Sequence, residues 1–203
     1  MRSGMLEPVQ IVLATANRHK AQELRRVFPA DEIVLPADVG VDFDHEETGD
    51  TYLENALGKA TALFRRVGRP VMADDSGLSV AALGGEPGVL SARYGSSPGG
   101  PRLADADRNR YLLARMEGLS DRRAFFVCCL VFVAGDYRFF VAQETVEGMI
   151  AHEPAGTGGF GYDPLFYLPE RGLTVAELPD AEKDRISHRG RAAARLAPVL
   201  ASL

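Results

Sequence analysis

Val9-Gln10-Ile11-Val12-Leu13-Ala14-Thr15-Ala16-Asn17-Arg18-His19-Lys20 is the stretch that decides the class of fold. Its apolar, β-branched first half predicts a short buried strand, and its polar second half leads into apolar positions that recur at helical spacing. A strand that passes directly into a helix is a building unit of α/β proteins. Backbone N–H groups and the positive end of the helix dipole meet Lys20 here, so the junction is either a phosphate site or a solvated helix start.

Helix and strand patterns alternate along the rest of the chain. Apolar residues recur at steps of three and four over 53–67, and a capping box of Thr51 and Glu54 precedes them. Further strands are expected at 70–73, 124–133 and 138–146, and further helices at 105–117 and after Ser187 as N-cap. The pattern predicts an α/β protein with a mixed β-sheet, organised as a single domain over residues 1–203.

The composition limits the classes of partner. The 203 residues are 46% hydrophobic and 25% charged, with a formal net charge of −5, which argues against binding of a nucleic acid polymer. A phosphate ligand of this acidic chain is therefore expected to be small and accompanied by Mg²⁺. The adjacent Cys128 and Cys129 exclude a disulfide framework, and the sequence has neither an export signal nor a membrane-spanning run. We therefore expect a cytoplasmic protein with no membrane partner.

Carboxylates gather at two places in the first half of the chain. Asp74-Asp75-Ser76-Gly77 follows the strand expected at 70–73, and two consecutive carboxylates there are costly to keep together without a cation or a proton between them. Mg²⁺ is the favoured cation, because it takes one or two protein carboxylates and leaves room for water and phosphate. Glu46 or Glu47 would add a further carboxylate. The alternative is a capped turn, with Asp as the cap and Gly at the reversal.

The second half of the chain offers an aromatic, glycine-rich loop and a basic turn. The run Ala155-Gly156-Thr157-Gly158-Gly159-Phe160-Gly161-Tyr162-Asp163-Pro164 combines backbone that a ligand can approach closely with the flat faces of Phe160 and Tyr162. It is either a nucleotide-gripping loop or a tight turn. Lys183, His188 and Arg189 surround the start of the last helix, where positive charge is unfavourable. An anion or a carbonyl-rich base would compensate them, and a solvated basic turn is the alternative.

Taken together, these segments resemble one family, the inosine triphosphate pyrophosphatases, also called the Ham1/RdgB-like proteins. The resemblance covers nearly the whole chain. It rests on residues 13–20 with 23–24, on 46–49 with 54–56 and 59–60, on 73–78, on 87–88 with 91–94, on 153–164, and on Lys183 with 186–190. It implies a fold with an elongated mixed sheet flanked by helices, in two lobes with a substrate cleft between them. It also implies a homodimer and Mg²⁺-dependent hydrolysis of ITP, dITP and XTP to the monophosphate and pyrophosphate, which removes non-standard purine nucleotides from the pool.

The resemblance also assigns roles to single residues. Asp75 would be the catalytic base and, with Glu46, would hold Mg²⁺. The other assigned residues would bind the phosphates, the sugar or the purine of the substrate. They are Thr15, Ala16, Asn17, Arg18, His19, Lys20, Ser76, Phe160, Gly161, Tyr162, Asp163, Lys183, His188 and Arg189. Phe160 would stack on the purine. Donors from His188 or Arg189 would favour a 6-keto base over adenine. Ala16 departs from the family, in which many members have glycine.

Two other functions are weighed against this one. A pyrophosphatase of the related Maf type would act on modified or pyrimidine nucleotides, but its motifs differ in the regions of Phe160 and His188. A nucleotide-binding regulator without hydrolysis would have no need of a carboxylate that activates water beside a metal. The long segment Gly84 to Arg102 is expected to be a lid, a binding loop or an oligomer contact. The sequence does not rank ITP, dITP and XTP.

Overall fold

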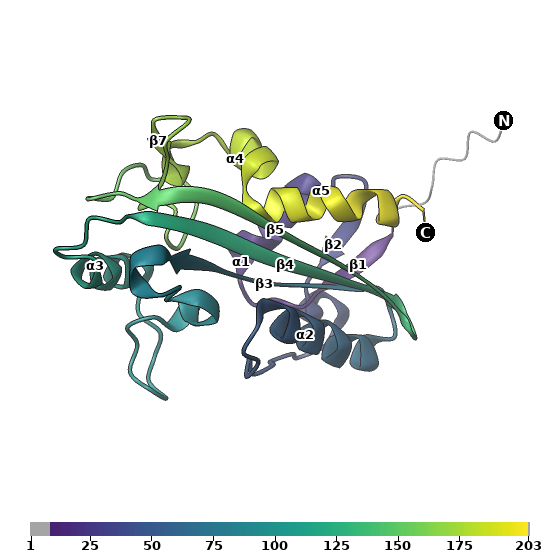
Figure 1. Cartoon of the computed structure of the whole chain (residues 1–203). Helices are drawn as coiled ribbons and strands as arrows, with labels where there is room; N and C mark the ends of the chain where they lie inside the picture. Colours follow the sequence, from purple (N-terminus) through teal and green to yellow (C-terminus); the bar gives the residue numbers. More distant parts are fainter. Residues whose placement is uncertain (1–8, 203) are drawn as a thin grey trace. The chain divides into compact units, whose positions relative to one another are not determined.

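The computed structural model describes residues 9–202. Figure 1 shows helices and strands alternating along the first half of the chain, followed by two long neighbouring strands. The strands are β1 (Gln10–Leu13), β2 (Glu32–Val34), β3 (Val71–Val80), β4 (Arg123–Gly135), β5 (Arg138–Ile150), β6 (Phe166–Leu168) and β7 (Leu173–Thr174). The α-helices are α1 (Arg18–Val27), α2 (Tyr52–Val67), α3 (Asp105–Arg115), α4 (Asp180–Ile186) and α5 (His188–Leu200).

The strands of residues 9–202 form one mixed sheet of seven strands in the order β2-β1-β3-β4-β5-β6-β7. Strand β1 pairs in parallel with both β2 and β3, whereas β5 pairs with β6 and β6 with β7 in antiparallel fashion. This confirms the predicted α/β class and its mixed sheet. The hairpin expected near Gly135-Asp136 is present, because Asp136 and Tyr137 connect β4 to β5.

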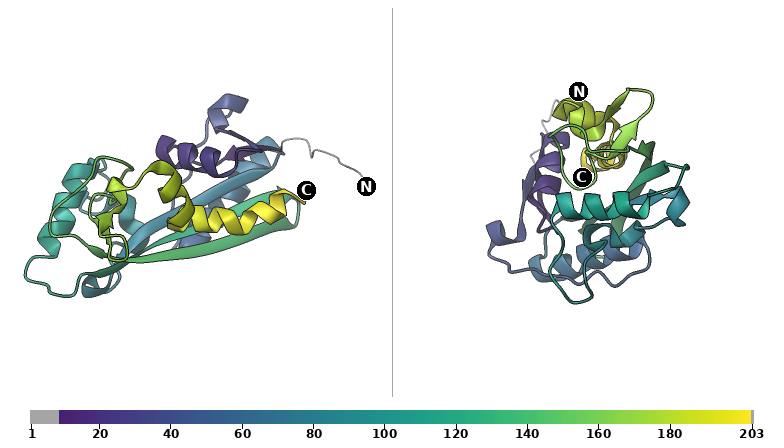
Figure 2. Two further views of the ribbon diagram at one scale, coloured as in Figure 1. Left: turned by 90° about the horizontal axis from the view of Figure 1, so that it is seen from above. Right: turned by 90° about the vertical axis from the view of Figure 1, so that its left-hand side faces the viewer.

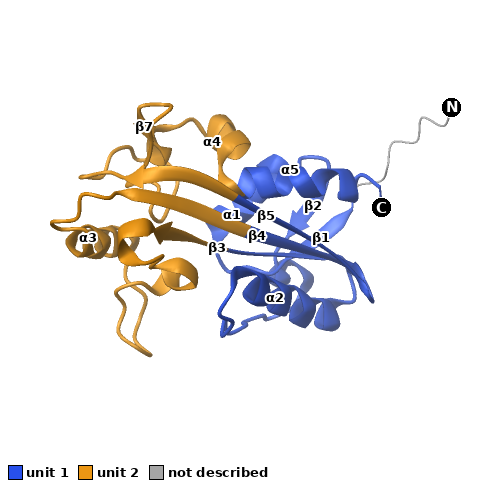
Figure 3. Ribbon diagram, in the orientation of Figure 1, with its two compact units in different colours: residues 1–75, 129–144, 189–203 blue, residues 76–128, 145–188 orange. Residues whose placement is uncertain are grey.

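The chain divides into two compact units, coloured in Figure 3. Unit 1 comprises 1–75, 129–144 and 189–203, and unit 2 comprises 76–128 and 145–188. Within unit 1, α2 covers one face of the sheet and α1 and α5 cover the other, as Figures 1 and 2 show. The first of these faces carries an apolar core to which β1, α2, β3 and β4 contribute Val12, Ala56, Leu63, Val71 and Val131. Unit 2 has its own core around Leu78, Leu112, Phe126 and Phe166.

Local sequence signals explain the helices of unit 1. Asn17 caps α1 through its side-chain oxygen, which accepts from the N–H groups of His19 and Lys20. The predicted capping box at α2 is present, because Thr51 accepts from the N–H of Glu54 and the Glu54 carboxylate accepts from the N–H of Thr51. Helix α2 therefore begins where the sequence predicted, whereas α1 begins at Arg18, within the polar stretch that was expected to lead into the helix.

Two predicted boundaries are wrong. Strand β3 does not end at residue 73 but continues through Asp74-Asp75-Ser76-Gly77 to Val80, so these residues do not form a capped turn. The register of β1 with β3 covers only Val71 and Met72, so Asp74 to Gly77 lie beyond that pairing, in the part of β3 whose other neighbour in the sheet is β4. The place of this segment within the sheet overrides the turn preference of Ser-Gly. Strand β5 likewise runs beyond Val146 to Ile150. The segment 84–102 is not wholly irregular, because it contains a 3₁₀ helix at Gly88–Arg93.

Two sequence-based exclusions are tested in part. Cys128 and Cys129 are both buried, and neither belongs to a disulfide, as expected. Within residues 9–202, no helix has both the length and the apolar character needed to cross a bilayer. The expected lack of an export signal concerns residues 1–8, which lie outside the described part of the chain.

Candidate active site

The loop between β1 and α1 is organised by its own polar side chains. The Thr15 hydroxyl accepts from the N–H of Asn17 at 3.1 Å, and Asn17 Oδ1 accepts from the N–H groups of His19 at 2.9 Å and Lys20 at 3.3 Å. Ala16, Arg18 and His19 are exposed. The first turn of α1 is thus fixed in place, with exposed residues on either side of its cap.

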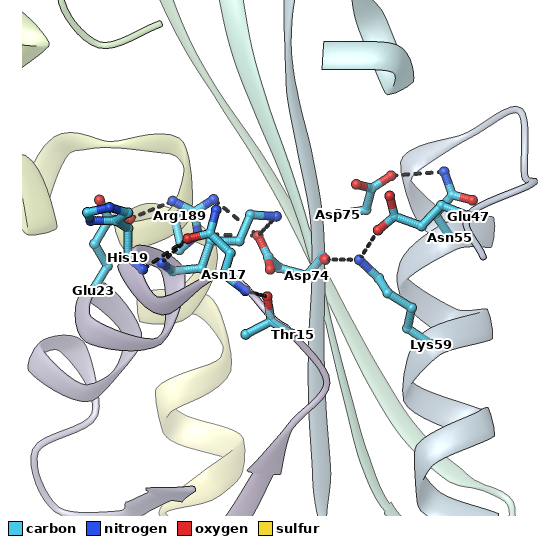
Figure 4. Close-up of polar contacts among 11 residues, drawn as sticks. Thr15, Asn17, His19, Glu23, Glu47, Asn55, Lys59, Asp74, Asp75 and Arg189 are labelled. Carbon is cyan, nitrogen blue, oxygen red and sulfur yellow. Dashed lines mark hydrogen bonds and ion pairs between the residues drawn. The ribbon is translucent and has the colours of Figure 1, made fainter. Parts of the chain in front are cut away.

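Lys20 points from α1 to the middle of β3. Its Nζ lies 3.0 Å from Asp74 Oδ2, and the same oxygen accepts from Arg189 Nη2 at 3.1 Å and Nε at 3.3 Å. Arg189 Nη1 in turn donates to Glu23 Oε2 at 2.5 Å. Lys20, Glu23, Asp74 and Arg189 form the buried ion cluster, of which Figure 4 labels Glu23, Asp74 and Arg189. Two cations and two carboxylates balance one another in it.

The counter-charges within this cluster explain the titration of Asp74. The side chain is fully buried, and burial by itself would raise its pKa. Lys20 and Arg189 outweigh that effect and hold the pKa of Asp74 far below its ordinary range. Asp74 is therefore a permanently charged anchor for two cations, not a group that exchanges protons near neutral pH.

Asp75 points away from its neighbour, toward α2. Its Oδ2 accepts from Asn55 Nδ2 at 3.0 Å, while Asn55 Oδ1 accepts from the N–H of Gly49 at 2.8 Å. On the same side, Lys59 Nζ donates to Glu47 Oε1 at 2.5 Å and to the Asp74 carbonyl oxygen at 2.6 Å. Figure 4 shows these contacts on the right of β3. Glu47, Asn55, Lys59 and Asp75 form the acidic cluster, which holds two carboxylates and one cation.

Asp75 titrates in the opposite direction from Asp74. Burial raises its pKa, and the nearby Glu47 raises it further, while Lys59 and the hydrogen bond from Asn55 lower it without cancelling the rise. The pKa of Glu47 is lowered, because the charge and hydrogen bond of Lys59 outweigh its burial. Asp75 is thus the carboxylate of this pair that gains most from a bound cation or a proton.

The alternation of side chains along a strand separates the two aspartates. Successive residues of a β-strand point to opposite faces, and Asp74 and Asp75 are successive residues of β3. The expectation that one cation lies between them is therefore wrong: Lys20 and Arg189 neutralise Asp74 on one face, and Asp75 meets Glu47 on the other. Of the two glutamates considered, Glu47 belongs to the acidic cluster, whereas Glu46 is exposed.

The glycine-rich loop of unit 2 is built around Asp163. The Asp163 Oδ2 atom accepts from the N–H of Phe160 at 2.8 Å and from Lys183 Nζ at 2.6 Å. Lys183 Nζ also lies 5.0 Å from the centre of the Phe160 ring. Gly159 has a φ of +68°, and a Cβ there would lie 2.1 Å from Asp163 Oδ2, so only glycine permits this turn.

Phe160 and Tyr162 differ in their environment. Phe160 is partly exposed, whereas Tyr162 is buried and its hydroxyl donates to the Ser91 carbonyl at 2.9 Å. Only Phe160 therefore offers a ring face to a ligand. His188, at the end of unit 2, is buried and stacks on Phe126 at 4.7 Å between ring centres.

The cations that sequence analysis placed at the last helix have protein partners. Arg189 contacts Asp74 and Glu23, and Lys183 contacts Asp163. Glu23 and Asn55 were recognised from the sequence only as part of the family resemblance, without a role in the site. The structure shows Glu23 bonded to Arg189 and Asn55 bonded to Asp75.

The acidic cluster suits a hard divalent cation. Its donors are carboxylate oxygens, and its formal charge is −1 from two carboxylates and one lysine. Within residues 9–202, no three His, Cys, Asp or Glu side chains meet as a ready metal site. That is compatible with Mg²⁺, which usually binds one or two protein carboxylates and completes its shell with water and substrate phosphates.

Comparisons with known proteins show to which family the chain is similar. The chain matches the Ham1 family over residues 11–199. A dITP/XTP pyrophosphatase of Treponema denticola is 50% identical over 184 residues, which span 91% of this chain and 94% of the relative. One from Thermus thermophilus is 49% identical over 192 residues, 93% and 90% of the two chains. A HAM1 protein structure from Coxiella burnetii superposes with a TM-score of 0.85 at 40% identity, covering 96% of this chain and all of the other.

Proposed function

The chain belongs to the Ham1 family, and we propose that the acidic cluster around Asp75 is where its dITP/XTP pyrophosphatase reaction takes place. The enzyme is a hydrolase of nucleotide metabolism that releases pyrophosphate from dITP and XTP. The assignment of the site rests on the different surroundings of two neighbouring residues of β3, Asp74 and Asp75. Lys20 and Arg189 contact Asp74 Oδ2 on one face, and on the other face burial and the nearby Glu47 raise the pKa of Asp75.

Asp75 acts as the general base in this proposal. Its buried carboxylate, oriented by Asn55, accepts a proton from the water that attacks a phosphorus of the α–β bridge. The new bond is from the water oxygen to phosphorus, and the broken bond is from phosphorus to the bridging oxygen. Pyrophosphate then leaves, and the proton is carried on Asp75. A raised pKa suits this role, because a base works best when its pKa approaches the working pH.

Mg²⁺ is the proposed cofactor, with Asp75 and Glu46 or Glu47 as its protein ligands. Of these two glutamates, Glu47 is supported by its place beside Asp75 and Glu46 by the resemblance to the family. When bound, the metal supplies positive charge for the phosphate oxygens. Lys59 keeps Glu47 ionised through its 2.5 Å contact, so this carboxylate is available as a ligand.

The loop from Thr15 to Lys20 is proposed to hold the triphosphate. Arg18 and His19 are exposed beside the fixed first turn of α1, and the helix dipole favours an anion there. The Lys20 side chain is 15% exposed while its Nζ pairs with Asp74. It therefore presents positive charge to a phosphate and keeps its ion pair with Asp74. Ser76, which follows Asp75 on β3, is proposed to contact the substrate beside it.

The purine is proposed to be gripped by unit 2. Phe160 stacks on the base, the backbone of Gly161 to Asp163 lines the base and sugar, and Lys183 and His188 face the base edge. A 6-keto base accepts hydrogen bonds that the 6-amino group of adenine does not accept. Arg189 was expected to take part in reading the base, but its bonds to Glu23 and Asp74 favour a role in anchoring Asp74 and, through it, Lys20.

A substrate panel tests this function. We expect pyrophosphate release from dITP, XTP and ITP to exceed that from GTP, ATP and UTP, and to require Mg²⁺. Equal or better turnover of UTP would favour the Maf-type alternative. Full activity in EDTA would remove the metal from the proposal. The remaining expectations stay predictions: one domain over residues 1–203, two lobes with a substrate cleft, a homodimer and a cytoplasmic location.

A further inference from the structure

One residue of the glycine-rich loop is held on both sides of its backbone by helix α3. The N–H of Gly161 donates to Asp105 Oδ2 at 2.6 Å, and Asn109 Nδ2 donates to the Gly161 carbonyl oxygen at 3.0 Å. Gly161 has a φ of +63°, a conformation that glycine adopts without strain. Two side chains four residues apart on one helix thus fix a residue more than fifty positions further along the chain.

A third side chain of the same helix face reinforces this contact. Arg108 pairs with the other carboxylate oxygen of Asp105, and its guanidinium carbon lies 5.4 Å from the centre of the Tyr162 ring. Arg108 also donates to the carbonyl oxygens of Ala92 and Leu103, at 3.3 Å and 3.2 Å. The residues at i, i+3 and i+4 of α3 therefore contact the two residues that follow Phe160.

The opposite end of the loop is fixed independently. Thr174 donates through its hydroxyl to the Ala155 carbonyl at 2.8 Å, and the N–H of Gly158 donates to the Ala176 carbonyl at 2.9 Å. A Cβ at Gly156 would lie 2.5 Å from the Ala176 carbonyl carbon, so the backbone packs closely there. Phe160, the only ring of the loop that is open to a ligand, lies between the two attachments.

We propose that Asp105 and Asn109 are positioning residues for purine binding. They hold Gly161 so that the ring of Phe160 and the backbone of Gly161 are already placed when the base arrives. Holding a loop in its bound conformation lowers the entropy lost on binding, so the gain falls on affinity for the base and not on bond cleavage. The proposal rests on the purine-gripping role given to this loop in the proposed function.

A simpler role for Asp105 would be to stabilise α3, since acidic residues in a first turn do so generally. The helix contains a matched control for that role. Asp107 lies in the same first turn and pairs with Arg110 three residues later, as Asp105 pairs with Arg108. The two carboxylates are similarly exposed, 52% for Asp105 and 44% for Asp107. Of the two, only Asp105 bonds to the glycine-rich loop.

The test compares Asp105→Ala with Asp107→Ala in the full-length enzyme. We expect Asp105→Ala to raise the KM for dITP about tenfold, the scale of one lost hydrogen bond to a charged group, with kcat within about twofold of wild type. Exchange of the Gly161 amide hydrogen, followed by NMR, should become at least about tenfold faster. Asp107→Ala should leave KM and this exchange rate unchanged. Asn109→Ala provides a second variant, with the same rise in KM.

Three outcomes decide between the roles. The expected contrast in KM and in Gly161 exchange supports positioning. Equal effects of the two aspartate variants would reduce Asp105 to a stabiliser of α3 and overturn the proposal, as would a loss of kcat with unchanged KM. If the wild-type enzyme released no pyrophosphate from dITP, the proposed function would fail instead. The exchange contrast at Gly161 would then still confirm or refute the positioning contact.

Discussion

Asp74 and Asp75 are neighbours in sequence, yet they belong to regions with opposite electrostatics. On one face of β3, Asp74 is surrounded by Lys20 and Arg189, and its charge is matched. On the other face, Asp75 meets Glu47, and the acidic cluster keeps an excess of negative charge. One strand thus places two residues of the same type in opposite surroundings: the pKa of Asp74 is lowered by its two cations, and that of Asp75 is raised by burial and by Glu47. The identity of a side chain does not set its role; the face on which it lies does.

The largest expected effect is on stability, from Asp74→Asn. Removal of one partner from a buried ion pair leaves uncompensated charge, which costs about 3–5 kcal/mol of unfolding free energy. Here Lys20 would lose its ion pair with Asp74, and Arg189 would keep its ion pair with Glu23. Urea denaturation at pH 7 measures the loss. Asp75→Asn is the control, because it removes a buried carboxyl whose pKa is raised, and it should keep or increase stability. Similar losses in both variants would erase the distinction between the two faces.

The second effect is on catalysis, from Asp75→Asn. An amide neither accepts the proton of the attacking water nor carries the charge that Mg²⁺ requires, so kcat should fall at least about 10²-fold. Binding of dITP, measured by calorimetry, should persist, because the substitution does not change Phe160 or the loop from Thr15 to Lys20. If the variant turned over dITP at nearly the wild-type rate, Asp75 would lose its role as the base.

The third effect is smaller and concerns Asn55→Ala. Asn55 joins Asp75 to Gly49, at 3.0 Å and 2.8 Å, so its loss should let Asp75 turn away from the reacting water. We expect kcat to fall about tenfold, the scale of one hydrogen bond to a charged group. The measurement is kcat for dITP at saturating Mg²⁺. Thr51→Ala, which removes only the cap of α2, is the control and should lower stability but not kcat.

Local patterns in the sequence predicted much of the fold. The β1 and α1 junction, the capped start of α2 and the mixed sheet all follow from short-range signals such as periodicity and capping residues. The length of β3 did not, because Asp-Asp-Ser-Gly by itself favours a turn, whereas in the structure these residues continue a strand that has β4 as a neighbour in the sheet. A window of ten residues carries no information about that neighbour.

The sequence predicted which types of residue form the candidate site better than it predicted the contacts between them. Cations at the start of α5 were recognised as electrostatically unfavourable, and a ligand was expected to balance them. For Arg189 the balance comes from Asp74, 115 residues earlier in the chain, and from Glu23. Such distant contacts depend on how the helices pack on the sheet, which composition and spacing do not reveal. The opposite orientations of Asp74 and Asp75 were predictable in principle, once their place within a strand was known.

The smallest expected effect is a difference between the pKa values of Asp74 and Asp75, on the two faces of β3. In the metal-free enzyme, the carboxyl of Asp74 should titrate below the ordinary value for aspartate of about 3.9, and that of Asp75 above it. Because the pKa of Asp74 is lowered on folding, its contribution to stability is present above about pH 4 and is lost as the pH falls toward its folded pKa. Carbon-13 NMR of labelled aspartate follows both groups. Glu47→Gln removes a charge that disfavours ionised Asp75, so it should lower the pKa of Asp75 and move that of Asp74 less. If the two carboxyls titrated together, the separation of roles on β3 would have no electrostatic basis.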